Sequence, residues 1–260
     1  MPRSEGLRAR LGRKLLQWIR NRGPKPEYPE PETLIQEPEV EIAITRRDDG
    51  SLELRWHGDS APTALYAGTD PDHINTPVLL NIDEDHALIT DLDPKVRYYL
   101  AAEVDGRRIT VAERFIALPG VANLRDIGGY ATEDGKHVRW GQVYRAGSLA
   151  HLGPDDLAYL NTLDIHLVCD LRTDEEVAED PGKLIDGAQG LHVPLESDAH
   201  FSRSEKARAI LFQPDRVQQM MPDVYRYAVL DNSGALIGRV FRAMAEDDGL
   251  PVLIHCTAGK

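Results

Sequence analysis

A cysteine near the carboxyl-terminal end of the sequence has neighbours that could activate it. The strand-like run Val252–Ile254 leads into His255 and Cys256, and the small-residue turn Thr257–Gly259 and Lys260 follow. A tight loop at the end of a buried strand, when a helix follows it, directs its backbone N–H groups inward as an anion cradle. The same field favours the thiolate, which is the nucleophilic form of cysteine. The spacing therefore predicts a thiolate beside a site for a phosphate group.

A second segment with candidate site residues spans residues 123–130. It contains the charged pair Arg125 and Asp126, and then Gly128 and Gly129, which reach backbone conformations closed to other residues. Taken alone, this pattern is typical of a salt-bridged turn. Because the cysteine loop is also present, we favour the interpretation that the segment forms a wall of the substrate site.

Both segments resemble a known family. The loop of the cysteine-dependent tyrosine phosphatases, His-Cys-(x)5-Arg, is similar in its first part to His255-Cys256-Thr257-Ala258-Gly259-Lys260. The atypical bacterial-type branch of that family reads His-Cys-x-Ala-Gly-Lys-Asp-Arg, and its other hallmark resembles Asn123-Leu124-Arg125-Asp126-Ile127-Gly128-Gly129-Tyr130. The resemblance covers roughly residues 119 to 260. The family's arginine would be the second residue beyond Lys260 and its acidic residue the first. We expect the chain to continue past this point, since half a loop is a poor place for a domain to end.

The resemblance implies a role for each of these positions. Cys256 would attack phosphorus and carry the phosphate as a cysteinyl-phosphate intermediate. The substrate phosphate would be bound by the loop and the wall, at positions Thr257, Ala258, Gly259, Lys260, Arg125 and Asp126. His255 would orient the loop and tune the thiol. Arg172 would support the site from behind, with a structural salt bridge as the alternative role. No metal or other cofactor is expected.

The general acid is a separate question. In many cysteine phosphatases it lies on the loop after the strand predicted here at Leu191–Leu195, which makes Asp198 a tentative general acid and Glu196 a weaker candidate. The bacterial-type branch instead carries an acidic residue within the phosphate loop, which speaks against both. The choice depends on the distance from each carboxyl group to the leaving oxygen, and the sequence does not give that distance.

The elements that position these residues form an α/β pattern over residues 119–260. Thr173 is a candidate N-cap, and Cys169, inside an apolar strand, is predicted to be an inert core thiol. We expect a phosphatase domain, C-terminally incomplete, with a central, mostly parallel sheet flanked by helices. Strands are predicted at Gln142–Ala146, Ile165–Leu171, Leu191–Leu195 and Val252–Ile254, and helices at 154–163 and 173–179.

Residues 203–246 are predicted to form a helical insertion before the last strand. Their apolar residues, methionines among them, recur at helical spacing, which is typical of core packing. The resemblance offers the alternative of a lid that excludes water from the phosphate site.

Residues 39–118 are predicted to form an all-β domain that contains no chemical constellation. Seven strands in this length, with Trp56 suited to the core, favour a β-sandwich. The run Leu92–Pro94 followed by Tyr98 resembles a corner of fibronectin type III modules, and we predict a fibronectin-like sandwich. The seven strand-like runs are Val40–Thr45, Leu52–Trp56, Thr63–Ala67, Val78–Ile82, His86–Leu92, Arg97–Val104 and Ile109–Phe115.

Residues 1–38 are predicted to lie outside both domains. The segment 7–20 has apolar residues at helical spacing with arginines between them, and the first 25 residues carry eight basic side chains against the single acid Glu5. Such a basic amphipathic helix lies on anionic membranes or docks on its own protein. The Pro- and Glu-rich run through Pro38 is typical of an extended linker.

Composition limits the classes of function. The formal net charge of −13 argues against nucleic acid as a partner. The two cysteines, Cys169 and Cys256, do not make a disulfide framework, and no apolar run has the length of a membrane span. We therefore expect a cytoplasmic location, with peripheral membrane contact through residues 7–20 as a further hypothesis.

The predicted function is hydrolysis of phosphomonoesters by a protein tyrosine or dual-specificity phosphatase. Its substrate would be a phosphorylated protein or a phosphoinositide. One alternative is a catalytically inactive module that binds phospho-ligands. Another is a sulfur-transfer enzyme, whose catalytic cysteine also lies in a strand-end loop, although the segment 123–130 speaks against it.

Overall fold

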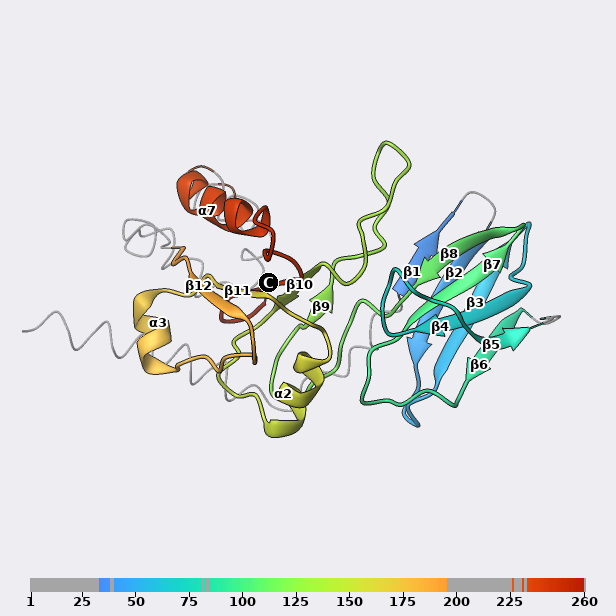
Figure 1. The fold of residues 1–260 in the computed structure, drawn as a ribbon, viewed down its shortest axis with the longest axis horizontal. Helices are drawn as coiled ribbons and strands as arrows, with labels where there is room; N and C mark the ends of the chain where they lie inside the picture. The colour runs from blue at the N-terminus through green and yellow to red at the C-terminus, as the bar shows by residue number, and fades with distance from the viewer. Residues whose placement is uncertain are drawn as a thin grey trace, which may run out of the picture. The chain divides into compact units, whose positions relative to one another are not determined.

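The computed structural model describes residues 33–37, 40–80, 82, 85–195, 226, 231 and 233–259 (Figure 1). The described chain from Thr33 onward belongs to one structural unit that contains three sheets. Several predicted features lie outside the described residues: the basic helix at 7–20, the greater part of the insertion at 203–246, Glu196, Asp198 and Lys260.

Eight strands form two antiparallel sheets in the first part of the described chain. One four-stranded sheet has the order β1-β2-β3-β6 and the other the order β5-β4-β7-β8. The seven strands β2 to β8 fall on the seven predicted runs, which confirms those predictions to within a few residues at each end. The bounds are Thr33–Gln36 (β1), Val40–Arg46 (β2), Leu52–Gly58 (β3), Ala64–Gly68 (β4), Thr76–Leu80 (β5), His86–Ile89 (β6), Tyr99–Val104 (β7) and Arg107–Val111 (β8).

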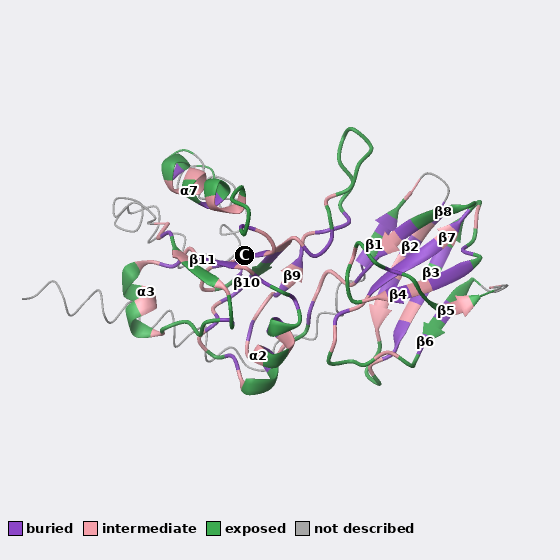
Figure 2. Cartoon of the chain, viewed as in Figure 1, coloured by how far each residue is buried: buried purple, intermediate pink, exposed green. Residues whose placement is uncertain are grey.

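Alternation along these strands places every second side chain in one shared core. In β2 the side chains of Val40, Ile42 and Ile44 are buried, and the residues between them are partly exposed. Trp56 belongs to the same core, as predicted, and so does Leu100 from the other sheet. The two sheets therefore pack face to face as a sandwich (Figure 2).

The predicted linker boundary at residue 38 is wrong, because the sandwich begins earlier. Strand β1 pairs antiparallel with β2, with Thr33 opposite Ile44 and Ile35 opposite Ile42. The side chains of β1 alternate between buried and exposed, as expected of a strand with one face on a core. The alternation extends over four residues in Pro-rich surroundings, which is why composition favoured a linker.

Five further strands form a sheet of a different kind. Its order is β12-β11-β13-β10-β9, and all its neighbouring strands are parallel except the edge pair β9 and β10. This confirms the predicted mostly parallel sheet, with β12 beginning two residues before its predicted start. The bounds are Arg125–Asp126 (β9), Val143–Ala146 (β10), Leu167–Asp170 (β11), Gln189–His192 (β12) and Val252–His255 (β13).

Helices pack on both faces of this sheet. Helix α2 (Pro154–Asn161) buries Leu160 in a cluster with Tyr144, and helix α7 (Gly234–Met244) buries Val240 in another cluster with Val252. Tyr144 and Val252 belong to opposite faces, because Val143 and not Tyr144 is the partner of Val252. None of the helices in the described ranges is long and apolar enough to cross a membrane.

A third helix, α3 (Asp174–Glu179), starts at the carboxyl end of β11. The hydroxyl of Thr173 accepts the backbone N–H of Glu176, and the Glu176 carboxylate accepts the N–H of Thr173. This reciprocal pair is a capping box, and it confirms Thr173 as the N-cap.

The sandwich and the mostly parallel sheet are joined by buried contacts. The Arg97 guanidinium donates to Asp126 at 2.9 Å, and the two side chains are 4% and 0% exposed. The carboxylate of Asp126 also accepts the N–H groups of Gly128 and Gly141. The indole of Trp140 packs within the sandwich core. Packing is therefore continuous across the predicted domain boundary at residues 118 and 119.

Candidate active site

Cys256 lies at the carboxyl end of β13, the central strand of the mostly parallel sheet. Parallel α/β sheets bind ligands at this edge. The cysteine is half-buried, and the backbone N–H of Gly259 donates to its Sγ at 3.3 Å. The thiol is therefore not enclosed in the core, and an amide of the following turn is directed at it.

Three successive carbonyl oxygens, those of residues 257–259, are held from outside the loop. They accept, in order, the N–H of Ser148 at 3.2 Å, Nδ2 of Asn123 at 2.8 Å and Nη2 of Arg145 at 2.6 Å. The donors come from the segment before β9 and from the end of β10. Their contacts fix the orientation of three consecutive peptide groups.

This orientation determines where the loop amides point. In a trans peptide the N–H group is directed away from the carbonyl of the same plane. The outward carbonyls of Thr257 and Ala258 therefore turn the N–H groups of Ala258 and Gly259 into the loop, which agrees with the hydrogen bond from Gly259 to the sulfur. Consecutive inward amides make a nest that binds anions. A nest formed in this way would lie beside Cys256.

The loop closes against the end of β10 at Gly259. This residue has a φ of +70°, and a Cβ built on it would lie 2.5 Å from the nitrogen of Gly147 and 2.7 Å from the carbonyl carbon of Ala146. Both of those atoms belong to the backbone. Glycine is required here for two independent reasons, the left-handed conformation and the close approach.

His255 lies beneath the loop with a carboxylate nearby. Its side chain is 3% exposed, and its Nε2 is 3.7 Å from Oδ2 of Asp170. Burial lowers the pKa of His255, although the Asp170 carboxylate opposes this effect. The imidazole is therefore neutral at pH 7. Burial also acts to raise the pKa of Asp170, but hydrogen bonds from Arg172 outweigh it, so that this pKa is lowered and the carboxylate is ionised.

Arg172 connects this carboxylate to the loop. Its Nη2 donates to Asp170 at 2.6 Å, and its Nη1 donates to Oγ of Ser148 at 3.2 Å. Since the N–H of Ser148 holds the carbonyl of Thr257, Arg172 reaches the loop through Ser148. Its side chain is 2% exposed, which fits the predicted supporting position behind the site.

Glu176 ties helix α3 to the residue that follows the cysteine. Its Oε1 accepts the hydroxyl of Thr257 at 2.6 Å, and its Oε2 accepts the N–H of Thr173 at 3.0 Å. One carboxylate thus caps the helix and restrains the loop. This contact fixes the hydroxyl of Thr257 on the α3 side.

The two predicted wall residues point in opposite directions. Asp126 pairs across the strands with Tyr144, and its carboxylate is directed at Arg97, the ion-pair partner from the sandwich. Arg125 pairs with Arg145, whose side chain contacts the loop. Of the predicted wall residues, Arg125 is the one on the side of the phosphate loop.

The sequence alone did not single out four residues that contact the loop, namely Asn123, Arg145, Ser148 and Glu176. Asn123 lies within the quoted motif and has a φ of +55°, a conformation that asparagine tolerates better than most residues. Arg145 lies in a predicted strand, where alternation with the buried Tyr144 would have placed it on the other face. The other two contacts depend on the tertiary arrangement.

Two other kinds of site could exist in the described residues, one at the second thiol, Cys169, and one for a metal ion. Cys169 is buried, and burial raises its pKa to about 11, which confirms the predicted inert core thiol. Within the described part of the chain, no three His, Cys, Asp or Glu side chains are arranged to hold a metal ion. Asp198 and Lys260 lie outside the described residues.

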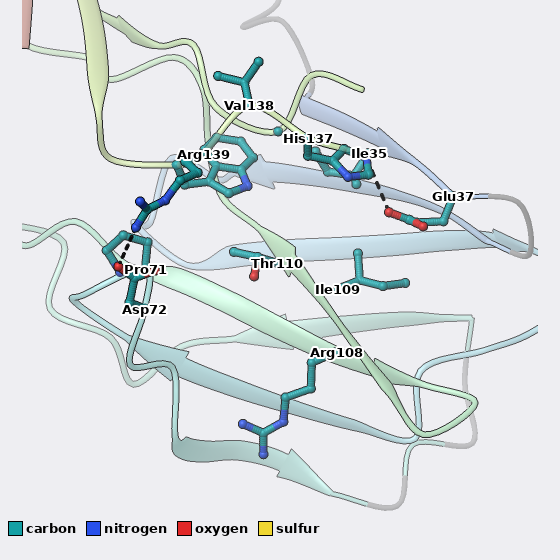
Figure 3. Close-up of a pocket in the computed structure, with 12 residues that line it drawn as sticks. Ile35, Glu37, Pro71, Asp72, Arg108, Ile109, Thr110, His137, Val138 and Arg139 are labelled. Carbon is teal, nitrogen blue, oxygen red and sulfur yellow. Dashed lines mark hydrogen bonds and ion pairs between the residues drawn. The ribbon is translucent and has the colours of Figure 1, made fainter. Parts of the chain in front are cut away.

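A pocket of about 290 Å³ lies against the sandwich, and it does not include the cysteine loop (Figure 3). Two of its basic side chains have acidic partners: Arg139 lies 2.9 Å from Asp72, and His137 lies 3.4 Å from Glu37. Arg108 also lines the pocket; it stacks over the ring of Tyr66 and donates to the carbonyl of Ile74. The lining contains neither Cys256 nor the residues that follow it, and the candidate chemistry therefore belongs to the loop.

The half-buried cysteine at the strand end can act as a nucleophile. Inward loop amides beside it would bind the anionic ester with which it reacts. Residues 116–260 match the model of the tyrosine phosphatase family, and the chain belongs to this family.

Two relatives support the assignment. A protein of Cupriavidus necator, whose name describes it as a tyrosine-protein phosphatase, is 29% identical over 62% of this chain and 55% of its own length. The triple specificity protein phosphatase PtpB of Mycobacterium tuberculosis is 30% identical over 55% of this chain and 58% of its own length. The chain thus spans little more than half the length of the curated relatives that it matches.

Proposed function

We propose that the protein hydrolyses phosphomonoesters through a cysteinyl-phosphate intermediate on Cys256. One observation carries this proposal: the outward-held carbonyls of residues 257–259 turn loop amides inward beside the sulfur. This geometry supplies both a nucleophile and donors for the equatorial oxygens of a phosphoryl group. Family membership supports the same chemistry.

The reaction has two steps. In the first step the Cys256 thiolate attacks phosphorus, the bond between phosphorus and the ester oxygen breaks, and the leaving oxygen takes a proton from a general acid. In the second step water attacks the phosphorus and gives a proton to the same acid group, which now acts as a base; the S–P bond breaks, and the thiolate is restored as inorganic phosphate leaves. Asp198 is the candidate general acid in this proposal, and Lys260 would add positive charge beside the loop.

The substrate range is part of the proposal. The name of the mycobacterial relative, a triple specificity protein phosphatase, supports a site that accepts more than phosphotyrosine. We therefore include phosphoserine, phosphothreonine and phosphoinositides as substrate classes. The basic segment 7–20 adds the hypothesis of peripheral membrane contact by a cytoplasmic protein.

The sandwich completes the proposed architecture. Of the seven strands β2 to β8, one sheet contains β2, β3 and β6, and the other contains β5, β4, β7 and β8 in that order. This arrangement supports a fibronectin type III-like domain, to which β1 adds an edge strand. Its proposed work is packing and partner contact.

The test of the proposed function is release of phosphate from p-nitrophenyl phosphate by the intact protein. We expect turnover by the wild type and a loss of at least about 10³-fold in kcat for Cys256→Ser, because a serine hydroxyl is a far weaker nucleophile here. The buried Cys169→Ser variant is the matched control and should retain turnover. Undiminished turnover by Cys256→Ser would overturn the proposal, whereas tight phosphate binding without any turnover would favour the binding module.

A further inference from the structure

Two arginines lie side by side next to the loop. Strand β9 pairs with β10 so that Arg125 is directly opposite Arg145. Opposed residues on neighbouring strands direct their side chains to the same face, with Cβ atoms about 4.5–5.5 Å apart. Ile254, two residues before Cys256, continues this row as the partner of Arg145 on β13. The two arginine side chains therefore share one face of the sheet, and Arg145 reaches the loop from that face.

The charge of this pair is uncompensated within the described ranges, where neither guanidinium has an ion pair. Arg145 uses one of its five N–H groups on the carbonyl of Gly259. The guanidinium carbon of Arg125 lies 5.8 Å from the ring centre of Phe115, and its Nε is buried without a hydrogen-bond partner. Like charges directly opposite each other destabilise a sheet. A bound anion would relieve the repulsion between the two guanidinium groups.

The nearest carboxylate in sequence does not serve this purpose. Asp126 follows Arg125 directly, but it points to the opposite face and is already neutralised by Arg97. The pair is also close to the reaction site, since Arg145 touches the loop itself. An anion held by both arginines would therefore lie beside a phosphate held by the loop.

We propose that Arg125 and Arg145 form a second anion subsite, which binds a carboxylate or phosphate group carried by the substrate in addition to the phosphate on the loop. The inference rests on the proposed function and names the substrate class: phosphomonoesters with a second negative group nearby. Guanidinium groups bind carboxylate and phosphate alike, with paired N–H donors in one plane.

The first test measures ligand binding without turnover. The intact protein carrying Cys256→Ser is titrated calorimetrically with phenyl phosphate and with 3- and 4-carboxyphenyl phosphate. We expect at least one carboxyphenyl isomer to bind about tenfold more tightly than phenyl phosphate, since a hydrogen bond to a charged group contributes this much. Adding Arg125→Gln should reduce the preference to less than about threefold, because one of the two guanidinium groups is then lost.

A charge-matched control separates the subsite from a general electrostatic effect. Arg139→Gln removes the same charge from a side chain that is 69% exposed and paired with Asp72, away from the loop. This variant should keep the full preference for the carboxyphenyl ligand. If Arg125→Gln weakens all three ligands equally, or if the parent protein shows no preference, the subsite proposal is overturned.

The two hypotheses fail in different ways. Failure of the proposed function appears as absent phosphate release by the wild type, while binding to the Cys256→Ser protein can still show the preference. Failure of the subsite appears as a preference that Arg125→Gln does not change, while turnover by the wild type continues.

Two further ligand pairs identify the natural source of the second charge. Inositol 1,4-bisphosphate is compared with inositol 1-phosphate, and a phosphotyrosine peptide with flanking aspartates is compared with its alanine counterpart. A preference that depends on Arg125 in either pair supports the subsite and identifies the substrate class. Equal affinities within both pairs, or preferences that the Arg125→Gln substitution leaves unchanged, would count against it.

Discussion

Replacing Gly259 with alanine tests whether the closed loop is what makes Cys256 effective. Alanine at a φ of +70° costs about 1–2 kcal/mol, because Cβ approaches the following carbonyl in left-handed conformations. The added Cβ would also lie 2.5 Å from the nitrogen of Gly147, where ordinary contacts begin at 3.4 Å. The loop must therefore move by about 0.9 Å relative to β10, a shift that follows from the ordinary contact distance.

Movement falls on the loop because the end of β10 is held on both sides. The Ala146 peptide lies in the ladder with His255, and the N–H of Gly147 donates to the carbonyl of Ala122 at 2.7 Å. A displacement of about 1 Å in a catalytic group costs on the order of 10²-fold in rate. We expect kcat/KM for p-nitrophenyl phosphate to fall about 100-fold, which corresponds to about 2.7 kcal/mol.

Gly187 provides the matched control. Its φ is +79°, but a Cβ there would meet nothing within 4 Å. Gly187→Ala therefore carries the same backbone penalty without the steric clash, and it should lose stability while keeping kcat/KM within about threefold. Thermal unfolding by circular dichroism measures the first effect, and steady-state kinetics measure the second. Equal kcat/KM values for folded Gly259→Ala and Gly187→Ala would refute the reasoning.

Three further predictions address the thiols, acid stability and the joint. Iodoacetamide at pH 7 should label Cys256 at least about 100-fold faster than Cys169, whose raised pKa and burial keep it a protected thiol; equal rates by peptide mass spectrometry would contradict this. Burial lowers the pKa of His255 below its ordinary value of 6.5. When the pH falls below 6.5, this histidine therefore takes up a proton in the unfolded chain before it does so in the folded chain. The stability contributed by the neutral imidazole is lost as the pH falls through 6.5. The free energy of unfolding, measured with urea between about pH 7.5 and 5.5, should therefore fall less steeply with decreasing pH for His255→Asn than for the wild type. Arg97→Met leaves Asp126 buried without its partner and should lower the free energy of unfolding, measured with urea, by about 3–5 kcal/mol. A loss below about 1 kcal/mol would contradict a stabilising role for this ion pair.

Local patterns were sufficient to predict most of the strands. Alternating residues and turn residues act over a few positions, so β2 to β8 were predicted from the chain itself. The cap at Thr173 and the buried thiol of Cys169 also follow from neighbours in sequence. The sequence does not predict strand β1, because four alternating residues are too few to distinguish a strand from an extended linker. Its pairing with β2 is seen only in the structure.

Long-range contacts were the part that the sequence did not reveal. The sequence pattern favours one wall for Arg125 and Asp126, but adjacent residues in a strand face opposite sides, and the structure directs Asp126 to Arg97. The donors that orient the loop come from positions more than 100 residues earlier, such as Asn123 and Arg145. A single sequence does not specify which distant side chain will meet a given carbonyl.

The central claim is that Cys256 carries the phosphate during turnover. Its most direct test is to mix the intact protein with p-nitrophenyl phosphate, quench in acid within the first turnovers, and examine the peptide containing Cys256 by mass spectrometry. We predict a phosphate adduct on Cys256 that appears before steady state and is absent from the Cys256→Ser variant. Phosphate release at the wild-type rate with no adduct on this cysteine would contradict it.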